Sequence, residues 1–485
     1  MTAVADERSA LDSLWISCDD LRTEFTLAMS SMYKAEVPLY GDLVRIVDGV
    51  NRSILGKSKR ALDPKVMAMR YGAETVNAAR LDIERHGAIR LGSPTELRIM
   101  RRVFAVLGLY PVGYYDLSPA GLPMHATAFR PLDEASLRCN PFRIFTSVLR
   151  PELVKDEVAR HLAVELLSRR NIFSRNLMEL LRLADTQGGR LTKDEGARFV
   201  QEAMKTFQWH ATATSTYDEY ARLAAEHPIL ADITCFPGSH INHLTPRTLD
   251  ISECQARMLV EGLKVKDRIE GPPPRSCPIL LRQTSFFAVE ESIKFLSVGR
   301  PGLEPIRGSH RARFGEIEER GAAVTLCGRR LYDDLLNEAM DKAKAVGEVI
   351  TPQKMNEFVE NAFRRYPDSW DELRKQGLIY CSFRLTGKPL QSQDVQVLKL
   401  DTLVEAGLVE AVPLTYEDFL PLSAAGIFQS NLGRATSSPL GAVADVEGFK
   451  DALGTTFHDP DELYRSMEER SIGECASKLG ICIDA

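Results

Sequence analysis

The spacing of apolar residues predicts a chain with much helix. Residues 19–50 carry apolar side chains three or four positions apart, which is helical periodicity. The clearest helix start lies at Ser93, an N-cap residue that Pro94 and Glu96 follow in the first turn. This pattern predicts a helix that runs to Gly108.

A longer helical block is expected over residues 150–227, where Thr192 and Glu195 form a second capping box. We interpret this block as a helical insertion into one elaborated domain that covers residues 1–485. Further helices are predicted where a cap or the same periodicity recurs, namely at 329–346, after Thr351-Pro352 and in the tail from Asp459.

Strand-like stretches are fewer and carry many polar residues. They lie at 86–91, in the second half of 117–132, at 279–289 and at 313–326. The last two contain β-branched and aromatic residues and no proline, as strands do. Strands set irregularly among helices indicate an α+β fold rather than repeated βαβ units.

The composition narrows the function classes. The 485 residues are 44% hydrophobic and 26% charged, which are ordinary globular values, and the formal net charge is −6. Because no run of five basic residues occurs, we expect no nucleic-acid partner. The sequence also has no apolar stretch of about 18 residues and no basic-then-apolar leader, so we expect no membrane span.

The cysteines point to the cytoplasm. Nine are scattered along the chain and none forms a CxxC motif, which is typical of reduced thiols in a cytoplasmic protein. Motifs of the common hydrolases and nucleotide-binding enzymes (GxSxG, the Walker loop, HExxH) are absent. The oligomeric state is left open by the sequence.

The first candidate site residues are His86 and Arg90. They are four positions apart, so on a strand both side chains point to one face. An imidazole beside a guanidinium suits a metal together with a carboxylate ligand. A surface strand with a basic edge is the plainer interpretation of the same residues.

Two further histidines, His240 and His243, lie in a short segment between Gly238 and Pro246. If this segment is extended, their odd separation sends the two rings to opposite faces, so at most one binds the same metal. The plainer interpretation is one structural and one surface histidine.

Carboxylates at Glu316 and Glu318 share one face of the predicted strand 313–326. Such a row usually indicates a solvated strand. However, the strand continues into apolar Ala322–Leu326, which indicates that it lines a cavity. Two histidines and one carboxylate, each on a strand, have the composition of a non-haem Fe(II) triad, although the same set also suits catalytic zinc.

Four long blocks, in this order, resemble the 2-oxoadipate dioxygenase/decarboxylase (hydroxyglutarate synthase) family of the vicinal oxygen chelate superfamily. They begin at His86 (HGAIRLG), His240 (HINHLTPR), Arg313 (RFGEIEERG) and Tyr416 (YEDFLPLSAAGIFQSN). The resemblance covers nearly the whole chain. It implies an α+β fold in which a vicinal-oxygen-chelate-like mixed β-sheet cups a metal site, with extensive helical insertions.

The resemblance also implies roles for individual residues. The iron ligands fall on His86, His243 and Glu316, and the arginine that anchors the substrate falls on Arg90. Gln283 corresponds to a pocket residue, and segment 415–433 corresponds to a helix that covers the substrate. On that helix, substrate contacts fall on Leu422 and Ser423, and Leu422 stands where we expect a smaller valine.

The implied activity is that of a non-haem Fe(II) dioxygenase. With dioxygen it would decarboxylate and hydroxylate a 2-oxo acid, namely 2-oxoadipate to 2-hydroxyglutarate in lysine breakdown. Three alternatives stay open on the sequence. One is a zinc or nickel isomerase or hydrolase on the same scaffold, and another is a non-catalytic protein that binds a metal or small molecules. The third is a structural protein with exposed charged strands, which would bind no stoichiometric metal.

Overall fold

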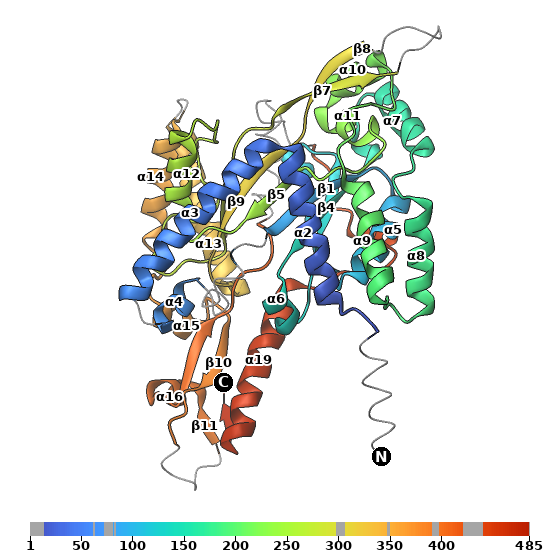
Figure 1. Cartoon of the computed structure of the whole chain (residues 1–485). Helices are drawn as coiled ribbons and strands as arrows, with labels where there is room; N and C mark the ends of the chain where they lie inside the picture. The colour runs from blue at the N-terminus through green and yellow to red at the C-terminus, as the bar shows by residue number, and fades with distance from the viewer. Residues whose placement is uncertain are drawn as a thin grey trace, which may run out of the picture.

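A mixed seven-stranded sheet forms the centre of the computed structural model (Figure 1), which describes residues 14–61, 64–71, 81, 84–296, 306–346, 350–389, 397–420 and 440–484. The strand order is β2-β3-β4-β1-β5-β9-β6. Their bounds are β1 Glu84–Leu91, β2 Tyr110–Asp116, β3 Met124–Arg130, β4 Arg143–Leu149, β5 His243–Pro246, β6 Leu281–Ser285 and β9 Phe314–Arg320.

Strands from distant parts of the chain meet in the middle of this sheet. β1 runs parallel to β4 and antiparallel to β5, while β9 lies between parallel β5 and antiparallel β6. The remaining strands form two-stranded ribbons outside the sheet, namely β7 Glu290–Phe295 with β8 Ile306–Arg311, β10 Cys381–Leu385 with β12 Val409–Pro413, and β11 Val397–Lys399 with β13 Cys482–Asp484.

Helices surround the sheet (Figure 1). Those in the first half of the chain are α2 Cys18–Glu36, α3 Pro38–Ala61, α4 Pro64–Tyr71, α5 Pro94–Val106, α6 Glu134–Cys139, α7 Glu157–Arg169, α8 Arg175–Thr186, α9 Lys193–Phe207, α10 Tyr217–Glu226 and α11 Pro228–Thr234. The later helices are α12 Ile251–Val260, α13 Leu326–Ala345, α14 Pro352–Phe363, α15 Trp370–Lys375, α16 Leu400–Glu405, α18 Val446–Leu453 and α19 Pro460–Leu479. Single 3-10 turns lie at Ser118–Ala120 and Pro151–Leu153.

The two faces of β1 serve different purposes. Ile89 and Leu91 belong to the apolar core formed with α2, α3, α5, α8 and α9. Ala88 belongs to a second core cluster on the other side, so His86 and Arg90, which share its parity, also face away from those helices. Among the described helices, none combines the length and apolar character needed to cross a bilayer.

Helix starts were predicted best, because capping is a local signal. Ser93 accepts a hydrogen bond from the Glu96 amide, and Thr192 and Glu195 form a complete capping box. The starts of α14 and α19 are also as predicted. Within 150–227 the structure contains α7 to α10, whereas the interpretation as an insertion stays a prediction.

Three predicted boundaries were wrong. The helix over 19–50 is two helices, because Pro38 opens α3 and cannot donate a hydrogen bond to the preceding turn. Of the predicted strand 279–289, only Leu281–Ser285 forms a strand, which is β6. The predicted strand 313–326 ends at Arg320; Gly321 follows, where the backbone packs so closely on Pro278 that an added Cβ would lie 2.3 Å from its carbonyl carbon.

Candidate metal centre

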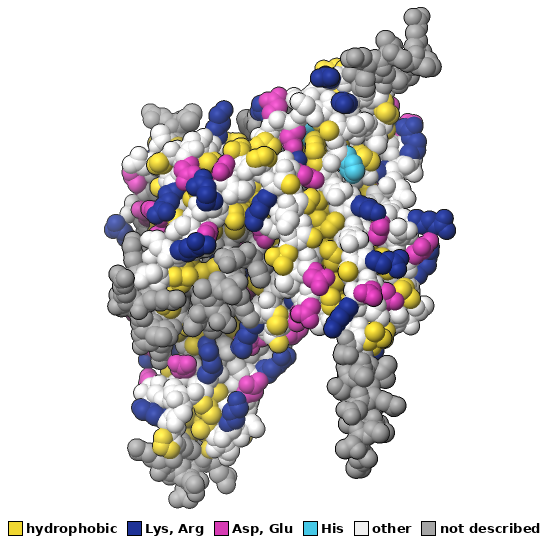
Figure 2. Space-filling view, in the orientation of Figure 1, with side chains coloured by type: hydrophobic (Ala, Val, Ile, Leu, Met, Phe, Trp, Pro, Cys, Tyr) yellow, Lys and Arg dark blue, Asp and Glu magenta, His cyan; other side chains and the backbone are white. Residues whose placement is uncertain are grey.

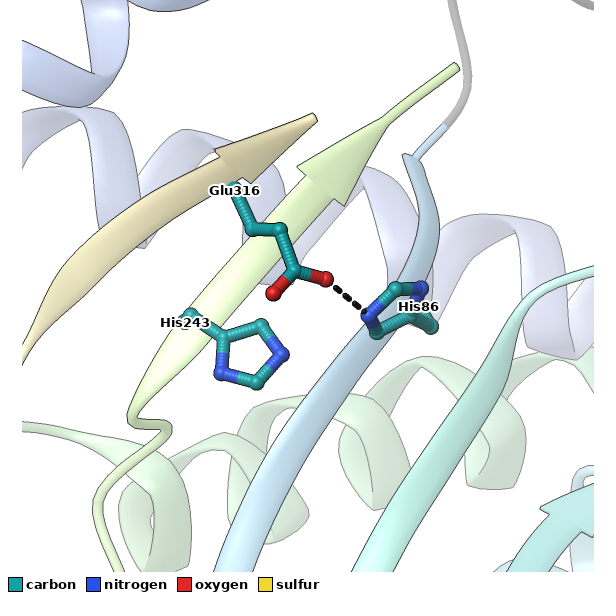
Figure 3. A group of neighbouring side chains, drawn as sticks. All are labelled: His86, His243 and Glu316. Carbon is teal, nitrogen blue, oxygen red and sulfur yellow. Dashed lines mark hydrogen bonds and ion pairs between the residues drawn. The ribbon is translucent and has the colours of Figure 1, made fainter. Parts of the chain in front are cut away.

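Three buried side chains converge from three adjacent strands (Figure 3). His86 lies on β1, His243 opens β5 and Glu316 lies on β9. The register places Ala88 opposite His243 and Thr245 opposite His86, so these side chains share one face of the sheet. None of the three converging side chains is more than 3% exposed.

The distances suit a single ion. His86 Nε2 lies 2.9 Å from Glu316 Oε1, and the rings of His86 and His243 are perpendicular with centroids 5.3 Å apart. One potential ligand atom from each residue lies within 4.8 Å of the others. With bonds of about 2.0 to 2.2 Å, one ion reaches all three after small side-chain adjustments.

The carboxylate of Glu316 gives a second indication that the site binds a cation. Its Oε2 is buried and has no hydrogen-bond partner in the described part of the chain. A buried carboxylate oxygen without a partner costs free energy, and a cation would remove that penalty. The residues present therefore fit a divalent metal held by two imidazoles and one carboxylate.

Glu318 holds the imidazole of His86 from behind. Its Oε2 lies 2.7 Å from His86 Nδ1, on the opposite side of the ring from Glu316. Thr245 Oγ1 lies 3.0 Å from His86 Nε2. A carboxylate that accepts from one ring nitrogen directs the other nitrogen, with its lone pair, toward a metal.

Glu318 and His243 have the charge states that a metal site requires, whereas the two carboxylates favour the protonated form of His86, whose Nε2 proton a bound metal would replace. Burial alone would raise the pKa of Glu318, but Arg143 and His86 outweigh burial and lower that pKa to about 2. Burial lowers the pKa of His86, yet Glu318 and Glu316 raise it overall. Burial, aided by His86 and Arg90, holds the pKa of His243 well below its usual value, so His243 is neutral.

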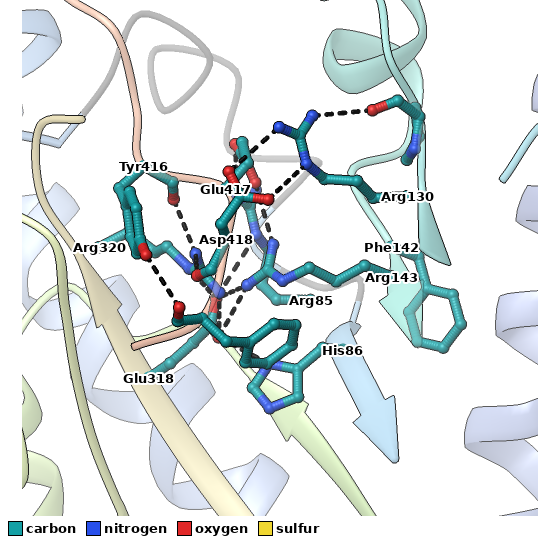
Figure 4. Close-up of polar contacts among 12 residues, drawn as sticks. Arg85, His86, Arg130, Phe142, Arg143, Glu318, Arg320, Tyr416, Glu417 and Asp418 are labelled. Carbon is teal, nitrogen blue, oxygen red and sulfur yellow. Dashed lines mark hydrogen bonds and ion pairs between the residues drawn. The ribbon is translucent and has the colours of Figure 1, made fainter. Parts of the chain in front are cut away.

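A buried network of arginines and carboxylates lies behind Glu318 (Figure 4). Arg143 donates to both Glu318 and Glu417, and Arg320 Nε lies 2.7 Å from Glu318 Oε1. Arg85 Nη2 lies 2.9 Å from both oxygens of Glu417. The network therefore ties the strand that carries Glu316 to a segment about 100 residues later.

The same segment is fixed at two further points. Arg130 Nε lies 2.7 Å from Asp418 Oδ1, and Tyr464 donates to Asp418 at 2.6 Å. These contacts place the ring of Phe419 against His86, with centroids 4.8 Å apart. An apolar ring therefore covers one side of the candidate centre.

The predicted covering helix is only partly tested. Within 415–433, residues 415–420 are described and are not helical. Arg320 donates to the carbonyl oxygens of Tyr416 and Asp418 in this stretch, and the covering helix itself stays a prediction. Leu422 and Ser423 lie outside the described residues.

Arg90 and Gln283 lie on the same side of the sheet as the candidate ligands. Arg90 is buried, and its Nη1 lies 2.5 Å from Asp232 Oδ2. Gln283, on β6, stands opposite Glu318 of β9, and its Oε1 finds no partner among the described residues. The structure thus brings the three candidate ligands, Arg90 and Gln283 to one face of the sheet.

His240 lies apart from the first centre. It precedes β5, and its Nε2 lies 3.0 Å from Asp232 Oδ1. With Asp232 and His310 it forms a second buried group of potential ligands. The expectation that His240 and His243 serve different partners agrees with this geometry, although the ligand assignment itself stays a proposal.

Sequence reasoning missed Asp232, His310, Thr245 and Phe419 as neighbours of the site. None lies in a pattern that distinguishes it, because each reaches the site through tertiary contacts. The role of Glu318 could have been found, since alternation already placed it beside Glu316.

On the molecular face in Figure 2, basic and acidic side chains are intermingled.

Comparison with known proteins gives consistent results. The model of one protein family, described as 2-oxoadipate dioxygenase/decarboxylase, matches residues 25–431. A protein of that name from Escherichia coli is 47% identical over 464 residues, covering 95% of this chain and 98% of the relative. One from Pseudomonas putida is 44% identical, covering 96% of this chain and 98% of the relative.

A solved structure is also similar along its whole length. The crystal structure of hydroxyglutarate synthase from Pseudomonas putida in complex with 2-oxoadipate matches with a TM-score of 0.83 and 41% identity. The match covers 96% of this chain and 100% of that one.

Proposed function

Because this chain belongs to the 2-oxoadipate dioxygenase/decarboxylase family, we propose that it converts 2-oxoadipate and dioxygen into 2-hydroxyglutarate and CO₂. The observation that carries the proposal is the convergence of His86, His243 and Glu316 in this chain, which matches members of the family over nearly its full length. The reaction balances, since one oxygen atom completes the new carboxylate at the former keto carbon and the other becomes the hydroxyl.

The metal in this proposal is Fe(II), held by His86, His243 and Glu316. Two neutral imidazoles and one carboxylate leave a divalent ion with one net positive charge, which favours an anionic chelating substrate. When bound, the ion supplies a chelation site for the 2-oxo acid and the electrons that activate dioxygen. Glu318 keeps the His86 ring in the orientation that this ligand set needs.

Arg90 binds a carboxylate of the substrate in this proposal. A guanidinium offers paired donors in a planar fork, and it stays charged at any working pH. Arg90 shares a strand face with His86, which puts it beside the proposed ion. Gln283 lines the pocket from β6.

Phe419 excludes water from one side of the reacting atoms in this proposal. The position of Phe419 against His86 supports this role, because it brings the start of segment 415–433 over the centre. We propose that Leu422 and Ser423 contact the substrate chain and thereby select its length.

The test is reconstitution of the metal-free protein with one metal at a time. Fe(II) should give 2-hydroxyglutarate and CO₂ from 2-oxoadipate only when dioxygen is present. Turnover without dioxygen on Zn(II) or Ni(II) would instead support an isomerase or hydrolase. Binding of 2-oxoadipate without turnover on any metal would support a binding protein.

A variant separates substrate binding from metal binding. Arg90→Ala should retain one metal per chain, while its KM for 2-oxoadipate rises at least about tenfold, the loss expected when a charged hydrogen bond is removed. Arg90→Lys should recover little of this loss, because an ammonium lacks the planar fork. A normal KM in Arg90→Ala would assign the carboxylate to another residue.

A further inference from the structure

A second buried polar cluster adjoins the proposed substrate arginine. Asp232 lies in α11, is 3% exposed, and approaches Arg90 with its Oδ2 at 2.5 Å from Nη1. The same stretch of chain also holds the backbone of Arg90, because Ser239 Oγ donates to its carbonyl oxygen at 2.8 Å. Arg90 is therefore fixed at both its main chain and its side chain by residues 232–239.

The other oxygen of Asp232 forms a hydrogen bond with His310, and His240 lies beside it without forming one. His240 Nε2 lies 3.0 Å and His310 Nε2 lies 2.9 Å from Asp232 Oδ1. The opposite ring nitrogen of His310, Nδ1, lies 2.9 Å from the Tyr220 hydroxyl. A continuous chain of contacts thus runs from Tyr220 through His310 and Asp232 to Arg90.

The composition of this cluster, two histidines and one aspartate, also fits a metal site. The charges argue against that interpretation. The guanidinium of Arg90 already neutralises Asp232, so a divalent cation among these residues would face an unshielded positive charge at close range in a buried site. His310 also directs Nε2 at the aspartate oxygen while its Nδ1 faces the Tyr220 hydroxyl, an arrangement that suits a neutral ring with its N–H on Nε2.

We propose that Asp232, held by His310, is the positioning residue of Arg90 and sets the direction in which its guanidinium meets the substrate carboxylate. This inference rests on the proposed role of Arg90. Arginine has a long side chain with much rotational freedom, and a fixed partner removes that freedom before the substrate arrives. Affinity improves when the binding group is already ordered.

The main test is Asp232→Asn, which keeps the shape of the side chain and removes its charge. Its KM should rise at least tenfold with 2-oxoadipate while kcat stays within threefold of the parent enzyme. Anaerobic calorimetry with 2-oxoadipate on the Fe(II)-loaded protein should show the same tenfold loss in Kd. An unchanged or tighter Kd would overturn the proposal, since Asp232 would then be neutral or would compete with the substrate.

Two comparisons separate positioning from a general loss of structure. Asp19→Asn removes the charge of a carboxylate paired with another buried arginine, Arg22, and should leave KM and Kd unchanged. His310→Gln retains a donor near the Nε2 position and should stay within threefold of the parent Kd, whereas His310→Ala should lose affinity at least fivefold. Equal affinities in the two His310 variants would overturn the proposal even if Asp232→Asn fails to fold.

Failure of the inference is distinguishable from failure of the proposed function. If the parent enzyme turns over 2-oxoadipate and Asp232→Asn has a normal KM, only the positioning role is wrong. If the parent enzyme does not turn over 2-oxoadipate, the function is wrong. A second equivalent of metal that is bound by the parent protein and lost in Asp232→Asn would also overturn the inference, because the cluster would then be a metal site.

Discussion

Glu318 Oε2 lies 2.7 Å from His86 Nδ1, whereas Glu316, two residues earlier on β9, reaches Nε2 of the same ring at 2.9 Å. Each carboxylate therefore contacts a different nitrogen of the same imidazole. Because Nδ1 donates to Glu318, Nε2 is the nitrogen left to give its lone pair to a metal once the metal replaces its proton. In the proposed ligand set, Glu316 would bind the ion and Glu318 would orient the histidine.

This relationship predicts different results for the two carboxylates. Glu316→Gln should abolish stoichiometric metal binding. Glu318→Gln should retain binding, with an affinity lower by about 10- to 100-fold, the usual effect of losing a carboxylate that orients a metal-binding histidine. Competition with a chelator of known affinity measures both.

Glu96→Gln is the matched control for Glu318→Gln. It also removes a buried carboxylate from an arginine, Arg170, but Glu96 makes no contact with His86 or Phe419. It should lower the thermal midpoint of unfolding and leave metal affinity unchanged. Equal losses of metal affinity in both variants would mean that Glu318 acts only through stability.

The two neighbouring histidines should behave differently on truncation. His243→Ala should lose the metal, because it removes one of three proposed ligands. His240→Ala should keep one metal per chain, since its contact is with Asp232. Metal analysis of the purified variants decides the assignment, and the reverse pattern would show that His240 is the ligand.

The end of β9 depends on a glycine. A Cβ on Gly321 would lie 2.3 Å from the backbone carbonyl carbon of Pro278, and backbone cannot move aside as a side chain can. Gly321→Ala should therefore destabilise the protein by at least about 2 kcal/mol, in the range of other overpacking changes. Denaturant unfolding measures the loss.

Gly41→Ala, within a helix, is the control for Gly321→Ala, because we expect it not to destabilise the protein. A Cβ at Gly41 in α3 meets nothing within 4 Å, so alanine should be neutral or should stabilise by up to about 1 kcal/mol. If Gly321→Ala were as well tolerated as Gly41→Ala, the close approach at Pro278 would be wrong.

Stability should also fall in mild acid because of His125. Burial, together with Arg150, lowers the pKa of His125 to about 4. In the unfolded chain His125 has a pKa of about 6.5, so between pH 6.5 and 4 it binds a proton that the folded protein does not. The contribution of His125 to the unfolding free energy is therefore fully present above about pH 6.5 and declines as the pH falls toward 4. The decline from this group is at most about 3 kcal/mol.

Removal of the imidazole tests this origin. His125→Gln should show a smaller decrease in unfolding free energy between pH 7 and pH 4.5 than the parent protein does. The ring of His125 packs on Phe449 of α18, with centroids 4.6 Å apart, so the variant will also be less stable at pH 7. An identical pH dependence in both proteins would assign the decline to other groups.

The sequence predicted best what depends on neighbouring residues. Capping at Ser93 and Thr192 is local, and both helices begin where predicted. The alternation that placed Glu316 beside Glu318 and His86 beside Arg90 follows from strand geometry alone. Strand ends were harder, because the end of β9 depends on contact between Gly321 and a distant segment.

The surroundings of the site could not be predicted from spacing. Asp232 reaches Arg90 across 142 positions, and the contact of Arg143 with Glu318 spans 175. Such pairs depend on the order of strands in the sheet, which no local pattern specifies. The ligand set came from the resemblance to a family, whereas the buried ion pairs that support it came from the structure.

The most direct test of the central claim is dioxygen uptake by Fe(II)-loaded protein supplied with 2-oxoadipate, with CO₂ and 2-hydroxyglutarate measured in the same sample. The account predicts one CO₂ and one 2-hydroxyglutarate for each dioxygen consumed, and no uptake by His86→Ala. Formation of product without dioxygen uptake, or no uptake despite stoichiometric iron, would contradict it.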